Sequence, residues 1–164
     1  MNYIKRENGF TLIEVMAVII IIGVLSAIAI PKFASSTTSA RQKADVATAH
    51  QVKGALDRYQ LDNGVYLKTG ELTATGGTLA STTLIPKYIS KLDASTTQQA
   101  VPAANKGFGV AALTGDSTDP TRFSIPDTTA VSNPIMIYLS TNGLAAEVRA
   151  YDEGLAHVLW TSAN

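Results

Sequence analysis

A single carboxylate, that of Glu14, lies near the start of an otherwise apolar run from Phe10 to Ile30. An ionised carboxylate is costly in an apolar medium, so it is rarely found there without a partner. If the chain were cut after Gly9, the new α-amine of Phe10 would lie about one helical turn from Glu14. A cation and an anion at this spacing can pair, either within one chain or between two chains. This pairing is the most specific functional hypothesis that the residues provide.

The apolar run is long enough to cross a lipid bilayer as a helix. At about 1.5 Å of rise per residue it extends over roughly 31 Å, and the hydrocarbon core of a bilayer measures about 30 Å. Lys5 and Arg6 precede the run, and basic flanks favour the cytoplasmic side, so the rest of the chain is expected outside.

Two other interpretations of this N-terminal region remain open. An ordinary secretory signal would use Ala27-Ile28-Ala29 as a small-x-small cleavage site, although the apolar run is longer than such signals usually are. A plain membrane anchor would let Glu14 reach the polar interface from the helix end.

Length and composition exclude several classes of function. The 164 residues suffice for one domain. Thirteen basic and 13 acidic side chains give a formal net charge of zero, so no specific nucleic-acid partner and no polybasic membrane contact is expected. The absence of cysteine excludes disulfides, thiolate metal sites and cysteine nucleophiles. The part after the apolar run must be held by packing, with or without a bound ion.

The hydrophobic pattern predicts that the helix continues beyond the apolar run, from residue 10 to about residue 62. A kink or local melting is expected at Pro31, because proline removes a backbone donor. The Asp62-Asn63-Gly64 triplet favours a left-handed cap that ends the helix. The side chains predicted to face inward are mostly small and recur every three or four residues: Ala40, Ala44, Ala47, Gln51, Ala55 and Tyr59, with Val52 and Leu56 beside them. The charged side chains predicted on the other side are Arg41, Lys43, Asp45, Lys53, Asp57 and Arg58.

The rest of the chain is predicted to be a loop-rich connection followed by a β-sheet. Thr, Ser and Gly dominate residues 69–83, which favours a loop, and the apolar segment 84–89 is expected to dock onto the helix. The predicted strands are Phe108–Leu113, Arg122–Ile125, Ile135–Ser140 and Leu155–Trp160. The Asn142-Gly143 pair predicts a hairpin turn, so residues 144–150 are interpreted as a strand with Glu147 and Arg149 outward, although they could also form a short helix. A helix followed by several strands gives an α+β fold, with the helix covering one face of the sheet.

Few residues after the apolar run could carry catalysis. His50 and His157 have no cysteine or dense carboxylate cluster near them in the sequence, so structural roles are favoured. No nucleophile elbow, zinc-protease motif or phosphate-binding glycine loop is present. Asp116, Asp119 and Asp127 could bind calcium through their carboxylates, but a solvated turn explains them as well. We expect neither a cofactor nor an enzymatic activity.

The residues around Glu14 resemble the signal of a known family. Gly9-Phe10-Thr11-Leu12-Ile13-Glu14, with Lys5-Arg6 before it and an apolar helix up to Pro31 after it, is similar to the class III signal of type IV pilins. The pseudopilins of type II secretion share this signal. The resemblance covers about the first 35 residues, and the missing cysteines depart from the many pilins that close a C-terminal loop with a disulfide.

This resemblance implies a filament subunit with the pilin fold, in which the C-terminal half of a long N-terminal helix packs on an antiparallel β-sheet head. Residues 1–9 would be a leader, residues 10–31 the membrane and filament-core helix, and residues 32–164 the head. The family's membrane peptidase, the prepilin peptidase, would cut after Gly9 and methylate the amine of Phe10. Glu14, Phe10 and Pro31 would serve assembly.

The partners that the resemblance implies are further copies of the chain in a helical filament, the prepilin peptidase, the pilus assembly machinery of the inner membrane and minor pilins. The precursor would sit in the cytoplasmic membrane, and the assembled subunit in an extracellular type IV pilus that serves adhesion, motility or DNA uptake.

An alternative is the major pseudopilin of a type II secretion system. Residues 55–66 are similar to the helix end of that protein, but Leu67 replaces its usual proline, and the Asp-Pro-Trp-Gly stretch before its calcium loop is missing. A third possibility, from a different class, is a membrane-tethered binding module.

Overall fold

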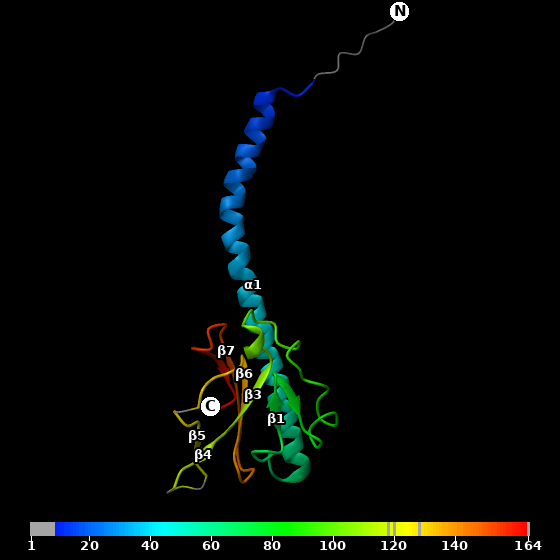
Figure 1. Cartoon of the computed structure of the whole chain (residues 1–164), viewed down its shortest axis with the longest axis vertical. Helices are drawn as coiled ribbons and strands as arrows, with labels where there is room; N and C mark the ends of the chain where they lie inside the picture. Colours follow the sequence, from blue (N-terminus) through cyan, green and yellow to red (C-terminus); the bar gives the residue numbers. More distant parts are fainter. Residues whose placement is uncertain (1–8, 118, 120, 128, 164) are drawn as a thin grey trace, which may run out of the picture. The chain divides into compact units, whose positions relative to one another are not determined.

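The computed structural model describes residues 9–117, 119, 121–127 and 129–163 (Figure 1). The chain divides into two compact units, one up to Thr37 and the other from Thr38 onward, which we call the head. The predicted leader residues Lys5 and Arg6 lie outside the described residues.

One helix, α1 (Leu12–Asn63), contains 52 residues and begins in the first unit. It continues through Pro31 and through the polar run 35–39 without a break, so no local melting occurs at the proline. In that run the hydroxyls of Ser35 and Thr37 donate to the carbonyls of Lys32 and Ala34, at 3.0 and 2.7 Å. These bonds satisfy the hydroxyls locally, so the polar run stays compatible with a helix.

The helix ends where the sequence predicts. Gly64 follows Asn63 with a φ of 80°, the left-handed conformation that glycine adopts without strain. Its N–H donates to the carbonyl of Gln60 at 2.7 Å, and the Asn63 side chain donates to the carbonyl of Tyr59 at 2.8 Å. The first bond satisfies a carbonyl that the last turn would otherwise leave unpaired, and the second ties the Asn63 side chain back to the helix.

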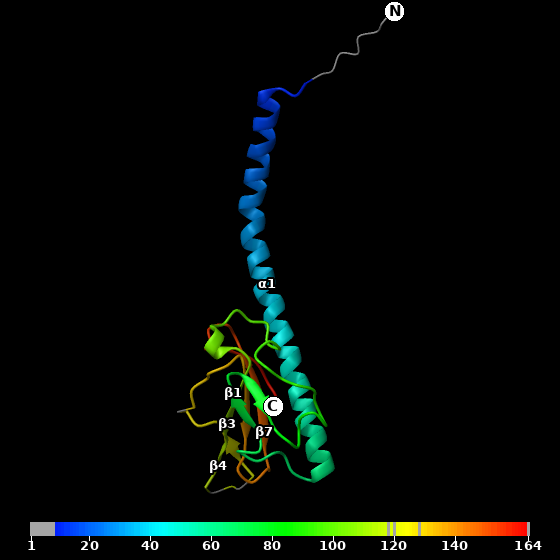
Figure 2. The same cartoon turned by 45° about the vertical axis from the view of Figure 1, so that its right-hand side comes forward.

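The head contains a four-stranded sheet in the order β3-β6-β7-β8. Figure 1 labels β3, β6 and β7, and Figure 2 shows the same strands turned by 45°. Its strands are β3 (Phe108–Ala112), β6 (Ile135–Leu139), β7 (Ala146–Tyr151) and β8 (Val158–Thr161). The β6–β7 and β7–β8 pairs are antiparallel, whereas β3 runs parallel to β6, with Phe108 opposite Ile135. The α+β class is confirmed, but the prediction of a wholly antiparallel sheet is wrong at this pair.

The turn predicted at Asn142-Gly143 joins β6 to β7, so residues 146–151 form a strand and not a helix. Gly143 has a φ of 74°, and its carbonyl accepts the N–H of Tyr66 at 2.8 Å. The predicted outward pair, Glu147 and Arg149, is half-buried, and the guanidinium Nε lies 2.5 Å from the carboxylate Oε1.

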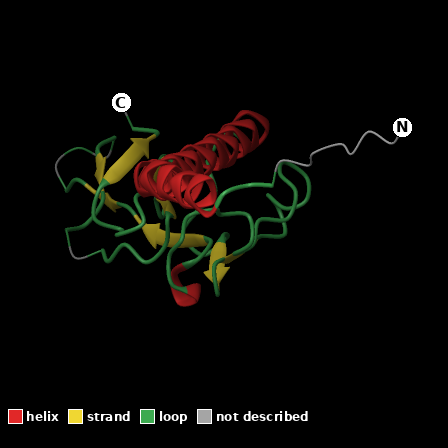
Figure 3. Cartoon of the chain, turned by 90° about the horizontal axis from the view of Figure 1, so that it is seen from above, coloured by secondary structure: helices red, strands yellow, loops and turns green. Residues whose placement is uncertain are grey.

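Two small hairpins complete the described strands of the head (Figure 3). One joins β4 (Thr114–Gly115) to β5 (Phe123–Ser124). The other joins β1 (Thr73–Thr75) to β2 (Thr78–Ala80) inside the segment expected to be a loop. This hairpin is fixed by a close backbone contact, since the N–H of Phe108 donates to the carbonyl of Gly77 at 3.0 Å. A tertiary contact overrides the weak local strand preference here.

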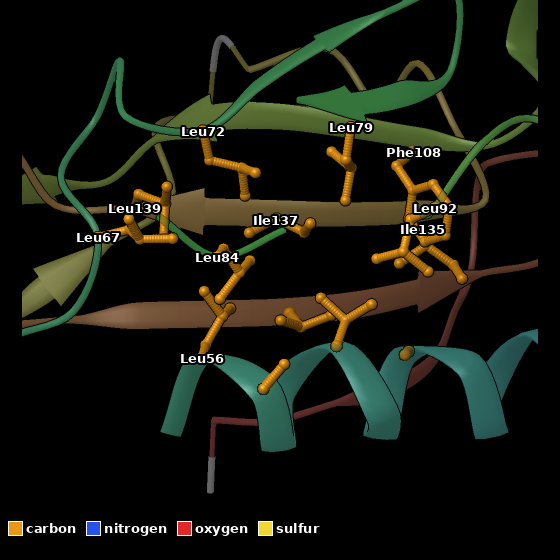
Figure 4. Packing of buried hydrophobic residues seen from close by; sticks show 14 of the residues in the cluster. Leu56, Leu67, Leu72, Leu79, Leu84, Leu92, Phe108, Ile135, Ile137 and Leu139 are labelled. Atoms are coloured by element: carbon orange, nitrogen blue, oxygen red, sulfur yellow. The ribbon is translucent and has the colours of Figure 1, made fainter. Parts of the chain in front are cut away.

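The core of the head lies between the second half of α1 and the sheet. Leu56 points from the helix toward the strands, where Ile137 lies (Figure 4). The apolar segment 84–89 docks here as predicted: Leu84 is fully buried, and the rings of Tyr88 and Tyr59 meet edge to face at 5.5 Å. The remaining core side chains are aliphatic or aromatic: Ala49, Val52, Ala55, Leu67, Leu72, Leu79, Leu92, Phe108, Ile135, Leu139, Val148 and Ala150.

The inward face of α1 is rotated relative to the predicted one. Ala40, Ala47 and Gln51 are exposed, whereas Asp45, expected to face solvent, is fully buried. Asp45 turns inward because its carboxylate accepts two backbone N–H groups, from Gln98 at 2.6 Å and from Gln99 at 3.2 Å. A buried carboxylate is tolerated when such donors replace water.

Candidate assembly site at the start of the helix

Glu14 lies in the first turn of α1 and is held there by Thr11. One carboxylate oxygen, Oε2, accepts the backbone N–H of Thr11 at 2.8 Å and the Thr11 hydroxyl at 2.8 Å. In return, the N–H of Glu14 donates to the Thr11 hydroxyl oxygen at 3.3 Å. This reciprocal arrangement is a capping box, in which two residues at the start of a helix satisfy each other's backbone donors.

Glu14 therefore also caps the start of α1, a role that was not predicted from the sequence. The Thr-x-x-Glu pattern before an apolar run is the sequence signal for such a cap. The capping box also leaves the Glu14 carboxylate able to pair with a cation. All hydrogen bonds to this carboxylate within the described residues end on Oε2, so the group keeps acceptor capacity for a further donor. Gly9 and Phe10 precede the helix and belong to no helix or strand, and Phe10 is 89% exposed.

The first half of α1 exposes an almost continuous apolar surface. The large hydrophobic side chains from Leu12 to Phe33 are between 49% and 80% exposed, and Pro31 lies on this surface. Among the described residues α1 is the one helix long and apolar enough to cross a membrane: its most apolar window has a mean hydropathy of 2.8, and none of that window is buried. So large an apolar surface requires a cover of lipid or of other protein chains.

The two histidines have structural contacts. His50 stacks on Trp160 with ring centroids 4.1 Å apart. The Nδ1 atom of His157 lies 2.9 Å from an oxygen of Asp152. Hydrogen bonds from His157 and from the backbone of residues 156 and 157 hold the pKa of Asp152 below its usual value.

The three aspartates considered for calcium do not come together. No group of three or more His, Cys, Asp or Glu side chains suited to a metal is found in the described part of the chain. Asp119 instead closes a turn, because its Oδ1 accepts the backbone N–H and the hydroxyl of Thr121 at 2.9 and 2.5 Å. Asp116 donates its backbone N–H to the carbonyl of Arg122 at 2.9 Å.

A comparison with known families and proteins supports this interpretation of the N-terminal region. A family profile described as "Prokaryotic N-terminal methylation motif" matches residues 4–30. The type II secretion system core protein G of Vibrio cholerae is 37% identical over 71 residues, which are 43% of this chain and 49% of that protein. The protein of the same name from Aeromonas hydrophila is 40% identical over 65 residues, 40% of this chain and 46% of that protein.

A pilin is found by the same comparison. The type IV major pilin protein PilE of Neisseria gonorrhoeae is 33% identical over 86 residues, which are 52% of this chain and 50% of that protein. The chain thus spans about half the length of the curated relatives it matches. No solved structure matches the chain.

The methylation motif, the relatives and the order of one long helix followed by a sheet agree with one another. Together they support the superfamily that comprises type IV pilins and the pseudopilins of type II secretion.

Proposed function

We propose that this chain is a structural subunit, not an enzyme, that polymerises through the first half of α1 into a helical filament. The observation that carries the proposal is the unburied apolar surface of residues 12–33, which starts at a carboxylate. A surface of this kind can exchange lipid for the helices of other copies, and a charged group at its start then fixes their register. The precursor is proposed to be anchored in the cytoplasmic membrane.

The proposed processing cuts the chain after Gly9 and methylates the new amine of Phe10. In the filament the cationic amine of one copy meets the Glu14 carboxylate of a neighbour, which the capping box has already oriented. Desolvation offsets much of the attraction in such a pair, so it contributes more to register than to net stability. A misplaced copy leaves a carboxylate unpaired in an apolar core, and this penalty selects the correct register.

Two branches of the superfamily use such filaments, and the relatives favour one of them. Several relatives carry the name of type II secretion core protein G, so we infer the subunit of a type II secretion pseudopilus as the first candidate. This reverses the order that the sequence favoured. A type IV pilus is the second candidate, because the alignment with the gonococcal pilin is longer, at 86 residues. The proposed partners are the prepilin peptidase, minor subunits and an inner-membrane assembly machine.

The processing step is tested by mass spectrometry of filaments purified from cells that express the full chain. We expect subunits that begin at Phe10 and carry one added methyl group on the amine. Filaments whose subunits still begin at Met1 would refute the processing and the charge pair together.

The charge pair is tested by Glu14→Gln, because glutamine can still accept the bonds of a capping box but carries no charge. We expect a cleaved, membrane-inserted subunit that forms few filaments. Thr11→Ala is the matched control that removes the cap and keeps the charge. Filament yield equal to wild type in Glu14→Gln would show that the charge is not used.

The two branches are separated by deleting the gene in its native cell. A pseudopilus subunit is needed for the release of secreted proteins, whereas a pilus subunit is needed for long surface filaments. Comparing the culture supernatant and negatively stained cells before and after deletion distinguishes the two outcomes.

A further inference from the structure

The head exposes large apolar side chains at two separate places. Within the described residues from Thr38 onward, the exposed large hydrophobic side chains are Leu61 at 82%, Leu144 at 56%, Val158 at 45% and Leu159 at 38%. A single exposed leucine is ordinary on a protein surface. Here the four side chains form two pairs, one at each end of the part of α1 that belongs to the head.

Leu61 and Leu144 form the first pair, which we call the end patch. Leu61 belongs to the last turn of α1, and Leu144 belongs to the turn between β6 and β7. The two segments meet just beyond the helix, where the N–H of Tyr66 donates to the carbonyl of Gly143 at 2.8 Å. In Figures 1 and 2 the end of α1 and the β6–β7 turn lie at the same end of the head.

Val158 and Leu159 form the second pair, on the edge strand β8. Val158 pairs with Tyr151, which packs on the sheet face away from α1, so only Leu159 of this pair faces the helix. Leu159 lines a hollow of about 330 Å³ whose other walls come from α1: Ser39, Gln42, Lys43 and Val46. We call this hollow the groove patch. The stack of Trp160 on His50, at 4.1 Å, holds β8 against the helix. An exposed apolar strand at a sheet edge is a surface that proteins usually cover.

The two patches cannot meet within one chain. Val46 and Leu61 are 15 positions apart on a continuous helix, which corresponds to about 22 Å at 1.5 Å per residue. Two different patches that fit each other form a heterologous contact, which builds an open filament when its rotation does not close into a ring.

The charges around the two patches are complementary. Arg41 and Lys43 are exposed on α1 beside the groove patch, and no ion pair of either is found among the described residues. The side chain of Asp62, next to Leu61, is 58% exposed; its Oδ2 accepts the hydroxyl of Tyr88 at 2.8 Å and lies 3.8 Å from the ammonium of Lys87. A cationic rim opposite an exposed carboxylate favours one orientation of the contact.

We propose that the end patch of one copy docks into the groove patch of the next, with Leu61 entering the hollow beside Leu159. The occupant is therefore a second copy of this chain. This inference rests on the proposed filament and adds to it a head-to-tail contact between heads, besides the packing of the apolar helices.

The absence of cysteine makes this contact directly testable. The full chain carrying Leu61→Cys and Leu159→Cys is assembled into filaments, treated with a mild oxidant and separated without reductant. A disulfide requires two Cα atoms within about 7 Å, so any bond between these positions joins two copies. We expect a ladder of multimers that returns to monomer after reduction.

Three controls make the result specific. Each single variant can form at most dimers. The pair Leu61→Cys with Thr75→Cys uses an exposed position on β1 outside both patches, and we expect no ladder from it. A second pair, Leu144→Cys with Leu159→Cys, samples the same contact through the other leucine of the end patch.

The outcomes separate this inference from the proposed function. Filaments of the double variants that give no ladder would refute the head-to-tail contact while leaving the filament role intact. Dimers from a single variant would indicate a symmetric contact and would also refute it. If both double variants fold but form no filaments, whereas the single variant Thr75→Cys does form them, the patches are needed for assembly and the proposal is supported. If the wild-type chain forms no filaments at all, the proposed function and this contact both fail.

Discussion

Replacing the buried Asp45 with alanine should destabilise the head more than any exposed change on the same helix. The side chain is fully buried, and its two oxygens accept the backbone N–H groups of Gln98 and Gln99. Alanine removes both acceptors and leaves two donors without partners away from water. A hydrogen bond to a charged group contributes about 1.5–3 kcal/mol, so we expect a loss of about 4 kcal/mol for the two bonds together.

The expected loss is a large share of the stability of a small domain, which is about 5–15 kcal/mol. It can be measured by urea unfolding of the full chain in detergent micelles. Trp160 is the only tryptophan and packs against the core and His50, so its fluorescence reports the head. With a urea dependence of about 1.5 kcal/mol per molar, the midpoint should fall by about 2.5 M.

Two further variants define the origin of the effect. Asp45→Asn keeps one carbonyl acceptor and should lose about half as much. Asp57→Ala is the matched control on the same helix, because its carboxylate is 42% exposed and pairs with Lys53 and Tyr66; it should lose about 1 kcal/mol. A midpoint shift below about 0.5 M for Asp45→Ala would refute the argument that the two backbone donors depend on this carboxylate.

Three other predictions concern the head. Gly77→Ala should cost about 2–4 kcal/mol in urea unfolding, because a Cβ at this positive-φ position would lie 1.9 Å from the carbonyl oxygen of Lys106; wild-type stability would contradict the close contact. Hydrogen bonds from Lys91 and Ser95 lower the pKa of Asp93, so the stability that this carboxylate contributes is present above about pH 4 and is lost as the pH falls further. Between pH 6 and pH 2 the temperature of thermal unfolding should therefore fall less for Asp93→Asn than for wild type. Burial and the hydroxyl of Tyr151 raise the pKa of Tyr138, so the stability that its protonated hydroxyl contributes is present below about pH 10 and is lost at higher pH. Ultraviolet titration should find one tyrosine that ionises only when the head unfolds, and this tyrosine should be absent from the variant Tyr138→Phe.

The elements predicted well from the sequence are those whose signals are local. The continuation of α1 past Pro31 followed from apolar periodicity, and its end at Asn63 followed from an Asn-Gly pair that suits a left-handed cap. The strands β6, β7 and β8 followed from β-branched and aromatic residues separated by turn residues. In each case the residues that decide the structure are neighbours in the chain.

The features that were missed depend on contacts distant in the sequence. The inward turn of Asp45 is decided by donors 53 and 54 residues away. The hairpin β1–β2 is fixed by the contact of Gly77 with Phe108. The parallel direction of β3 depends on the course of the chain between β3 and β6, which no local pattern encodes.

Much of the candidate site could be found from the sequence, because Gly9, Phe10 and Glu14 lie within one short motif. The structure adds Thr11, whose hydroxyl and N–H hold the carboxylate of Glu14. The end patch and the groove patch were not predictable, since each joins segments far apart in the sequence.

The parallel pairing of β3 with β6 leaves room for the surface of the head to diversify. Because β3 and β6 point the same way, residues 113–134 must return from the far end of one strand to the near end of the next. The five paired positions of β3 and β6 and the pairing of β6 with β7 lie outside this excursion, and closing a longer loop costs little free energy. Its exposed parts can therefore lengthen, shorten or change sequence between close relatives, while the ladders that hold the framework keep their register.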